Sequence, residues 1–250
     1  MSIRYDGVEI PNFITITNVK TQVLPNIENK LLQAPRAIGA IDVGTNYGTK
    51  VITVSFIFRD NSLGFIEKSE ALAEWLRVDD LKARKLVLPS HPNSYYLAKP
   101  NNSVELDDNI TIAKGEIEFI CLNPYRIDSN QILINKDMSN LRSSNEIKFN
   151  YIGSAKAFPQ IVLDVEGNCN SLKINFKNNI YDNYINLVGE FRAGDVVCVD
   201  LDRSKVYKNN NLDMSIWALD SRPHMLAKGL NAYRLEGNAA LSIKYFNKYL

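Results

Sequence analysis

Apolar and polar positions alternate along much of this chain, and the alternation predicts a mainly β protein. The clearest strand is KVITVSFIFR, residues 50–59, in which Ile52, Val54, Phe56 and Phe58 share one face of an extended segment. That face is entirely apolar, so another element must cover it. Shorter strands of the same kind are expected elsewhere in the first half, at FITITNVK, KLVLPS and ITIAKGEIEFICL.

One segment of the first half has helical periodicity instead. In FIEKSEALAEWLR, the apolar residues Phe65, Leu72 and Leu76 recur at spacings of seven and four, and glutamates occupy the opposite side. We expect this amphipathic helix to cover the apolar face of residues 50–59. Trp75 fits either core packing in that layer or an anchor at a protein interface, where tryptophan is enriched.

The second half of the chain is predicted to be an all-β domain. Residues 149–167 contain the turn-rich segment GSAKAFP followed by alternating Ile161, Leu163 and Val165, which we interpret as a linker and the first strand of that domain. More short strands follow at close spacing, with turn residues between them, at LKINF, INLVGEF, DVVCVDLD, SKVYKNN, MSIWALD, AYRLEG and LSIKYF. This pattern is typical of a β-sandwich or jelly roll. The predicted domains are residues 1–142, β-rich with one helix, and residues 143–250, the sandwich.

Two segments of the first half are longer than a compact domain requires. Residues 33–48 form a predicted long loop rich in glycine, and residues 100–109 form a polar extension rich in asparagine. A long glycine-rich loop is usually functional or held by a partner, and a mobile surface loop is the alternative. The residues expected at a subunit interface lie in these two segments: Asp42, Gly44, Asn46, Tyr47, Gly48, Asn101, Asn102, Glu105 and Asp107.

Composition excludes several classes of protein. The chain is 45% hydrophobic and 23% charged with a net charge of +1, which is ordinary for a globular protein and argues against sequence-specific nucleic-acid binding. We see no signal peptide and no apolar run long enough to cross a membrane, so we expect synthesis in a cytoplasm and no membrane partner. Cys121, Cys169 and Cys198 lie far apart and are expected to be free buried thiols.

The sequence contains no convincing catalytic, cofactor-binding or metal site. His91 and His224 are the two histidines; neither lies near a nucleophile motif, so both are expected to be solvated loop residues. Asp200 and Asp202 follow an apolar strand and could chelate a divalent ion, yet the same pair suits the cap of a turn. We therefore predict a protein that is not an enzyme and that needs no cofactor.

Carbohydrate binding is the main alternative function. Exposed aromatic rings on a sandwich can stack against sugars, and Trp217, Tyr207 and Tyr233 are available for this. Their strand positions fit core packing equally well. Trp217 is the residue that we single out as a possible sugar platform.

Several segments, taken in order, resemble one family. They are the YDGV hairpin, the glycine-rich segment before KVITVSFIF, the helix ALAEWL, KLVLPSHPNSYYLAK, GEIEFICLNPYRI, the linker GSAKAFPQIVL, the hairpin GEFRAGDVVCVDLDRSKVY and the late GLNAYRLEGNAALSIKY. Their order and spacing run through nearly the whole chain. In these features the chain is similar to the distal tail (Dit) proteins of siphophages, which are phages with long, non-contractile tails.

The resemblance implies an N-terminal belt domain and a C-terminal galectin-like domain. It implies a homohexameric ring at the tail tip of the virion, with one face on the tail tube protein and the other on the tail-associated lysin or tip protein. It also implies that the sandwiches carry receptor-binding proteins and that the ring leaves a passage for DNA. The sandwich lacks the His-Asn-Arg-Trp constellation with which galectins hold galactosides, so the resemblance does not extend to that sugar site.

Overall fold

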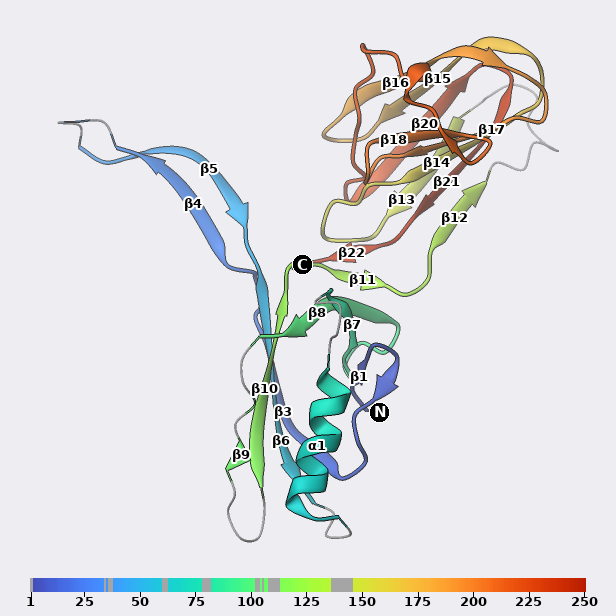
Figure 1. Ribbon diagram of the computed structural model, residues 1–250. Helices are drawn as coiled ribbons and strands as arrows, with labels where there is room; N and C mark the ends of the chain where they lie inside the picture. The colour runs from blue at the N-terminus through green and yellow to red at the C-terminus, as the bar shows by residue number, and fades with distance from the viewer. Residues whose placement is uncertain are drawn as a thin grey trace. The chain divides into compact units, whose positions relative to one another are not determined.

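The computed structural model describes residues 2–33, 35, 38–59, 63–77, 82–101, 104, 106, 107, 113–135 and 146–250. The chain divides into two compact units, Met1–Ile127 with Leu250, and Asp128–Tyr249. Both are built from antiparallel strands, and the described residues contain one α-helix, so the predicted mainly β fold is confirmed (Figure 1). The strand at Ile132–Asn135 already belongs to the second unit, although the sequence places residues 1–142 in the first domain.

The first unit is organised around one antiparallel sheet whose strands differ in length. Its strands, in the order in which they are hydrogen-bonded, are β2 (Val8–Glu9), β1 (Arg4–Tyr5), β7 (Arg84–Val87), β8 (Ser94–Pro100), β10 (Lys114–Cys121), β6 (Lys50–Phe58) and β3 (Ile14–Thr21). The short strand β9 (Leu106–Asp107) pairs with β10, and β11 (Arg126–Asp128) pairs with β8. Asp6 and Gly7 join β1 to β2 with φ values of 50° and 83°, which is the tight turn expected of an Asp-Gly pair.

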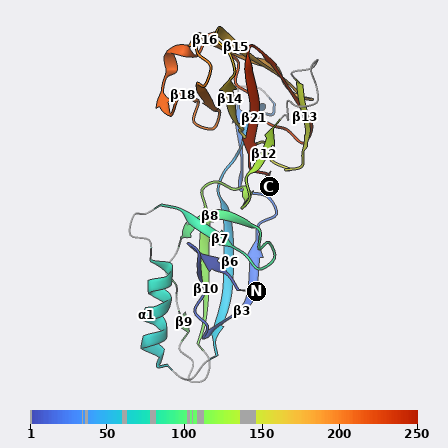
Figure 2. The same cartoon turned by 90° about the vertical axis from the view of Figure 1, so that its right-hand side faces the viewer.

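A helix covers the apolar face of this sheet, as predicted. Strand β6 buries every second residue, including Ile52, Val54 and Phe56, and α1 (Phe65–Leu76) runs along that side of the sheet (Figures 1 and 2). Leu72 is buried in the interface, and the Trp75 ring meets the Tyr5 ring edge-on at 5.8 Å between centroids. Trp75 therefore packs against the core, with part of its ring left exposed.

Residues 41–47 of the predicted long loop at residues 33–48 form one strand of a β-hairpin, which corrects the sequence-based expectation for that part of the segment. β4 (Ile27–Leu32) pairs with β5 (Ile41–Tyr47) as a separate two-stranded sheet. The glycines of this segment suggested a loop, but Gly44 lies inside a strand. Its φ of 144° accompanies a shift of register between Lys30 and Leu31. The hairpin extends beyond the ends of β3 and β6 (Figure 1).

The second unit is a sandwich of two antiparallel sheets around one core, as predicted. One sheet has the order β12 (Ile132–Asn135), β21 (Ala239–Tyr245), β14 (Gln160–Val165), β17 (Val196–Asp200), β18 (Lys205–Lys208) and β19 (Asn211–Leu212). The other has the order β13 (Glu146–Tyr151), β20 (Gly229–Glu236), β15 (Cys169–Lys177) and β16 (Asp182–Phe191). Alternate residues of both sheets point into the shared core, and β22 (Lys248–Tyr249) ends the chain.

Two details of this unit differ from the sequence analysis. β14 was expected to be its first strand, but β12 and β13 precede it, because each pairs with a late strand that local sequence cannot indicate. MSIWALD was expected to be a strand, but Met214–Ile216 form a single 3-10 turn, η1. The reason is local: the Asp213 carboxylate caps the turn by accepting a hydrogen bond from the Ser215 amide at 3.2 Å.

Candidate functional site

The hairpin β4–β5 is the most exposed apolar element of the first unit. Its large hydrophobic side chains are between 48% and 63% exposed: Ile27, Leu31, Leu32, Ile41, Val43 and Tyr47. A two-stranded sheet is marginally stable by itself, and exposed apolar side chains gathered on one element are typical of a contact with another molecule. The hairpin is therefore the first candidate for a protein–protein interface.

The two faces of the hairpin differ in chemistry. On one face Ile27 pairs with Tyr47, and the Thr45 hydroxyl donates a hydrogen bond to the Asn29 side-chain oxygen at 2.9 Å. The other face carries Lys30 opposite Gly44, and then the pair Leu32 and Ile41. Because Gly44 has no side chain, the Lys30 ammonium has free space beside the exposed Leu32–Ile41 pair.

Most of the predicted interface residues lie on this hairpin. Asp42, Gly44, Asn46 and Tyr47 are part of β5, and Gly48 follows it. The Asp42 carboxylate accepts a hydrogen bond from the Gly44 amide at 2.9 Å, and the Gly48 amide donates one to the Asn26 carbonyl at 2.7 Å. These two residues thus hold the hairpin's own shape, whichever molecule it contacts.

The remaining predicted interface residues belong to a different segment. Asn101 follows β8, and its backbone amide donates a hydrogen bond to the Glu118 carbonyl at 2.8 Å. Asp107 belongs to β9, which pairs with β10. Asn102 and Glu105 lie outside the described residues. The structure therefore separates the predicted set into two groups on different elements of the first unit.

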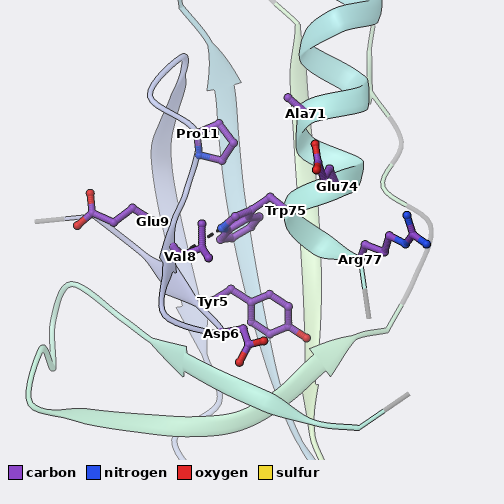
Figure 3. A pocket seen from close by; sticks show the side chains of 9 residues that line it. All are labelled: Tyr5, Asp6, Val8, Glu9, Pro11, Ala71, Glu74, Trp75 and Arg77. Carbon is purple, nitrogen blue, oxygen red and sulfur yellow. Dashed lines mark hydrogen bonds between the residues drawn. The ribbon is translucent and has the colours of Figure 1, made fainter. Parts of the chain in front are cut away.

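A groove between α1 and the N-terminal hairpin is the second candidate site (Figure 3). Its volume is about 450 Å³, within the range of 300–1,000 Å³ that is common for binding sites. The side chains around it are those of Tyr5, Asp6, Val8, Glu9, Pro11, Ala71, Glu74, Trp75 and Arg77. Trp75 lies in the middle, where its indole nitrogen donates a hydrogen bond to the Val8 carbonyl at 3.2 Å (Figure 3).

The groove combines an apolar middle with charged edges. Asp6 lies 3.3 Å from Arg84 in an ion pair, whereas Glu74 forms no ion pair with any described residue. Tyr5 closes one end: burial, followed by the charge of Asp6, raises the pKa of Tyr5 to about 12. Its hydroxyl donates to the Ala98 carbonyl at 3.3 Å. Tyr5 is thus a neutral structural side chain, and the groove can take an apolar group with a cation beside it.

One side chain of this groove, that of Trp75, was already a candidate from the sequence. Trp75 was considered as an interface anchor, and the structure gives it a core role and a partly exposed ring together. The other side chains come from the N-terminal turn and from the last turns of α1. No spacing rule links these two segments, so the groove had no signal in the sequence.

The candidate residues of the second unit do not assemble into a site. The Asp200 carboxylate accepts hydrogen bonds from the amides of Asp202 and Arg203, both at 3.1 Å, which is the turn cap considered as an alternative to a metal site. Within the described ranges, no group of three or more histidine, cysteine or acidic residues could hold a metal ion. Asp79, Asp80 and Asp108 are further acidic residues of the chain, and they lie outside the described ranges.

Two expectations about single side chains were wrong. His224 was expected to be solvated, but it is 1% exposed and its Nε2 atom lies 2.8 Å from the Tyr233 hydroxyl. Tyr233 was a candidate for sugar stacking, but it is fully buried. Tyr207 and Trp217 are partly exposed, and Trp217 packs against the core of the sandwich.

The three cysteines are free thiols, as predicted, but only one of them is buried. Cys121, Cys169 and Cys198 are free; Cys121 is buried, whereas the other two are partly exposed. Burial raises the pKa of Cys121 to about 12, so this thiol is unreactive near neutral pH. No helix in the described part of the chain has the length and apolar character needed to span a membrane.

Two family models match the chain, one on each half. The phage tail protein RIFT-related domain matches residues 7–121, and the siphovirus-type tail component, C-terminal domain, matches residues 152–249. No curated protein matches the sequence.

The fold is similar to that of a solved phage protein. The crystal structure of SPP1 Dit, described as a paradigm of hub adsorption apparatus in Gram-positive infecting phages, aligns with a TM-score of 0.81 at 15% identity, covering 100% of this chain and 99% of that one. A chain of the phage p2 baseplate in its activated conformation with Sr aligns with a TM-score of 0.42 at 9% identity, covering 93% of this chain and 90% of that one. The second value is too low to establish a common fold.

Proposed function

Since this chain belongs to the siphophage distal tail protein family, a family of structural tail hub proteins, we propose that it forms a homohexameric ring at the distal end of a phage tail. The observation that carries the proposal is the match of two phage-tail domains, in order, to the two units of one chain. The first unit, the belt domain, builds the ring. The second, the galectin-like domain, faces outward.

The ring joins the tail tube protein on one face to the tail-associated lysin or tip protein on the other, and DNA passes through it. Receptor-binding proteins attach to the galectin-like domains. The protein acts in the virion without catalysis. The exposed hairpin β4–β5 supports this role, because a cyclic assembly needs one surface patch that meets a different patch on the neighbouring copy.

The ring has a mass that can be measured directly. Light scattering of the purified protein, alone and mixed with tail extract, should detect a particle of about 170 kDa, six times the 28.3 kDa of the chain. Electron microscopy of the same sample should show six-fold rings. A monomer under both conditions would contradict the proposed function.

Carbohydrate binding by the second unit is a second candidate function. It is favoured by the partly exposed ring of Trp217 on the sandwich. If it is correct, the full-length protein should bind host cell-wall material, and Trp217→Ala should abolish binding while the thermal unfolding transition persists. Equal binding by the variant would exclude Trp217 as a sugar platform.

A further inference from the structure

Two exposed surfaces of the first unit complement each other. One is the groove with Trp75 in its middle and, at its edge, the carboxylate of Glu74, which forms no ion pair with a described residue. The other is the hairpin face that carries Lys30, Leu32 and Ile41. We propose that, within the ring of the proposed function, the Lys30–Leu32–Ile41 face of one copy docks into the Trp75 groove of the next copy. This names the receiving surface for the hairpin.

Each of the two surfaces carries apolar side chains that can pack against those of the other. Leu32 is 58% exposed and Ile41 is 61% exposed, and the two form an exposed apolar cross-strand pair on the hairpin. The groove offers Pro11 and Ala71 on its two sides, with the partly exposed Trp75 ring between them (Figure 3). Aromatic rings that are partly exposed in a pocket are typical centres of binding energy.

The charges match as well. Lys30 is exposed and forms no ion pair with the described residues, and the same holds for Glu74 in the last turn of α1. Because Lys30 shares a face of the hairpin with Leu32 and Ile41, a hairpin docked by these two side chains also presents the Lys30 ammonium to the groove whose edge carries Glu74. Such a charge pair contributes mainly to orientation and to the choice of partner.

A copy cannot fill its own groove. β4 follows β3 and β5 leads directly into β6, so the hairpin is fixed as an extension of this strand pair. Figure 1 shows the hairpin extending from the end of β6 away from α1, whereas the groove lies between α1 and the N-terminal turn. The occupant must come from a second copy. One hairpin and one groove per copy give the heterologous contact from which closed rings are built.

A charge swap tests the contact. In the full-length protein, Lys30→Glu and Glu74→Lys should each raise the concentration needed for half-assembly at least about tenfold, because each places like charges together. The double variant Lys30→Glu/Glu74→Lys should assemble more tightly than either single variant. Glu70→Lys, one turn earlier on the exposed side of α1, is the matched control and should assemble like the unchanged protein.

Cross-linking provides a second measurement that does not depend on charge. With Cys169→Ser and Cys198→Ser in the background, a Leu32→Cys chain mixed with a Pro11→Cys chain should give a dimer with a short bismaleimide. Each variant alone should give none. The dimer should form only under the conditions in which rings form.

The outcomes separate this proposal from the function on which it rests. If rings form but the charge variants assemble normally and no mixed dimer appears, the groove is not the receptor, while the ring stands. If the unchanged protein never assembles, both proposals fail. If Glu74→Lys leaves the ring intact but prevents binding of another tail protein, the groove serves that protein and the proposal is overturned.

Discussion

Burial, more than any charged partner, sets the properties of the ionisable side chains in the second core. The His224 ring is stacked on Phe176 at 3.8 Å between centroids, and its Nδ1 atom has no hydrogen-bond partner in the described structure. Desolvation lowers the pKa of His224 to about 3 and raises that of Tyr233. Both groups are therefore neutral at pH 7, and their mutual hydrogen bond joins two neutral partners.

Acid should destabilise the second unit through His224. In the unfolded chain its pKa is near 6.5 and in the folded chain it is about 3, so below pH 6.5 the unfolded state binds one more proton. As the pH decreases from 6.5 to 3, the free energy of unfolding should therefore decrease, by up to about 1.4 kcal/mol per pH unit from this group. Above pH 6.5 the group contributes no slope.

Urea denaturation between pH 4 and 7 measures this slope. His224→Phe should reduce the slope, although it also lowers stability at pH 7 because the Tyr233 hydroxyl loses its partner. His91→Gln changes an exposed residue of the first unit and should leave the second unit's transition unchanged. An identical slope in His224→Phe and the unchanged protein would show that His224 is not the titrating group.

Gly153 is required because a side chain has no space there. An added Cβ would lie 2.5 Å from the Lys248 carbonyl oxygen and would also overlap the Tyr151 hydroxyl. That hydroxyl donates to the Ala155 carbonyl at 2.8 Å and accepts from the Lys248 amide at 2.9 Å, so it cannot move freely. Gly153→Ala should therefore cost about 1–3 kcal/mol in urea denaturation. Ile152→Ala, at an adjacent exposed side chain, should stay within about 0.5 kcal/mol.

At the scale of elements, β6 and the hairpin β4–β5 differ in how much of each strand is buried, and we expect their local stabilities to differ accordingly. β6 has a partner strand on each side and buries one complete face, whereas all the paired residues of β4 and β5 bond only to each other. The hairpins β1–β2 and β17–β18 have shorter strands than β4–β5 but belong to larger sheets. An element without a core opens at a low free-energy cost.

Hydrogen exchange should reveal this difference. In the unassembled chain, the amides of Ile27–Leu32 and Ile41–Tyr47 should exchange far faster than those of β6, because the side chains of the hairpin are exposed. In assembled rings the same amides should become protected, while the rates in β6 change little. Equal exchange of the hairpin in the two states, followed by mass spectrometry, would show that assembly does not use it.

At the scale of the whole molecule, the two units have separate hydrophobic cores. The first is formed between α1 and the sheet that contains β6 and β10, and the second between the two sheets of the sandwich. Each unit is of ordinary domain size, so each can fold on its own core. The chain should therefore have two unfolding transitions.

A fragment of residues 128–250 tests this independence. It should give the β-rich circular dichroism of the sandwich and a single cooperative transition, with a midpoint close to that of the same unit in the full-length chain. A matched fragment that begins at residue 146 lacks β12, which pairs with β21, and should be less stable. A fragment 128–250 without a cooperative transition would show that the second unit depends on the first.

The sequence alone determined the local structure of this protein. Alternation of apolar residues placed β6, β14 and β15, a spacing of seven and four placed α1, and the YDGV hairpin placed the Asp6-Gly7 turn, whose left-handed φ values the structure shows. It also identified the mainly β fold, and most of the residues now seen on β5 as a candidate interface. These features depend on neighbours within a few positions, which a sequence displays directly.

Only the tertiary structure decided which distant segments meet. The pairing of β12 with β21, the burial of His224 against Phe176 and the groove between α1 and the N-terminal turn all join residues tens of positions apart. The hairpin's glycines suggested a loop until the pairing of Leu32 with Ile41 was known. Such contacts are selected by packing of the whole chain, and the periodicity of each segment is the same whichever partner it finds.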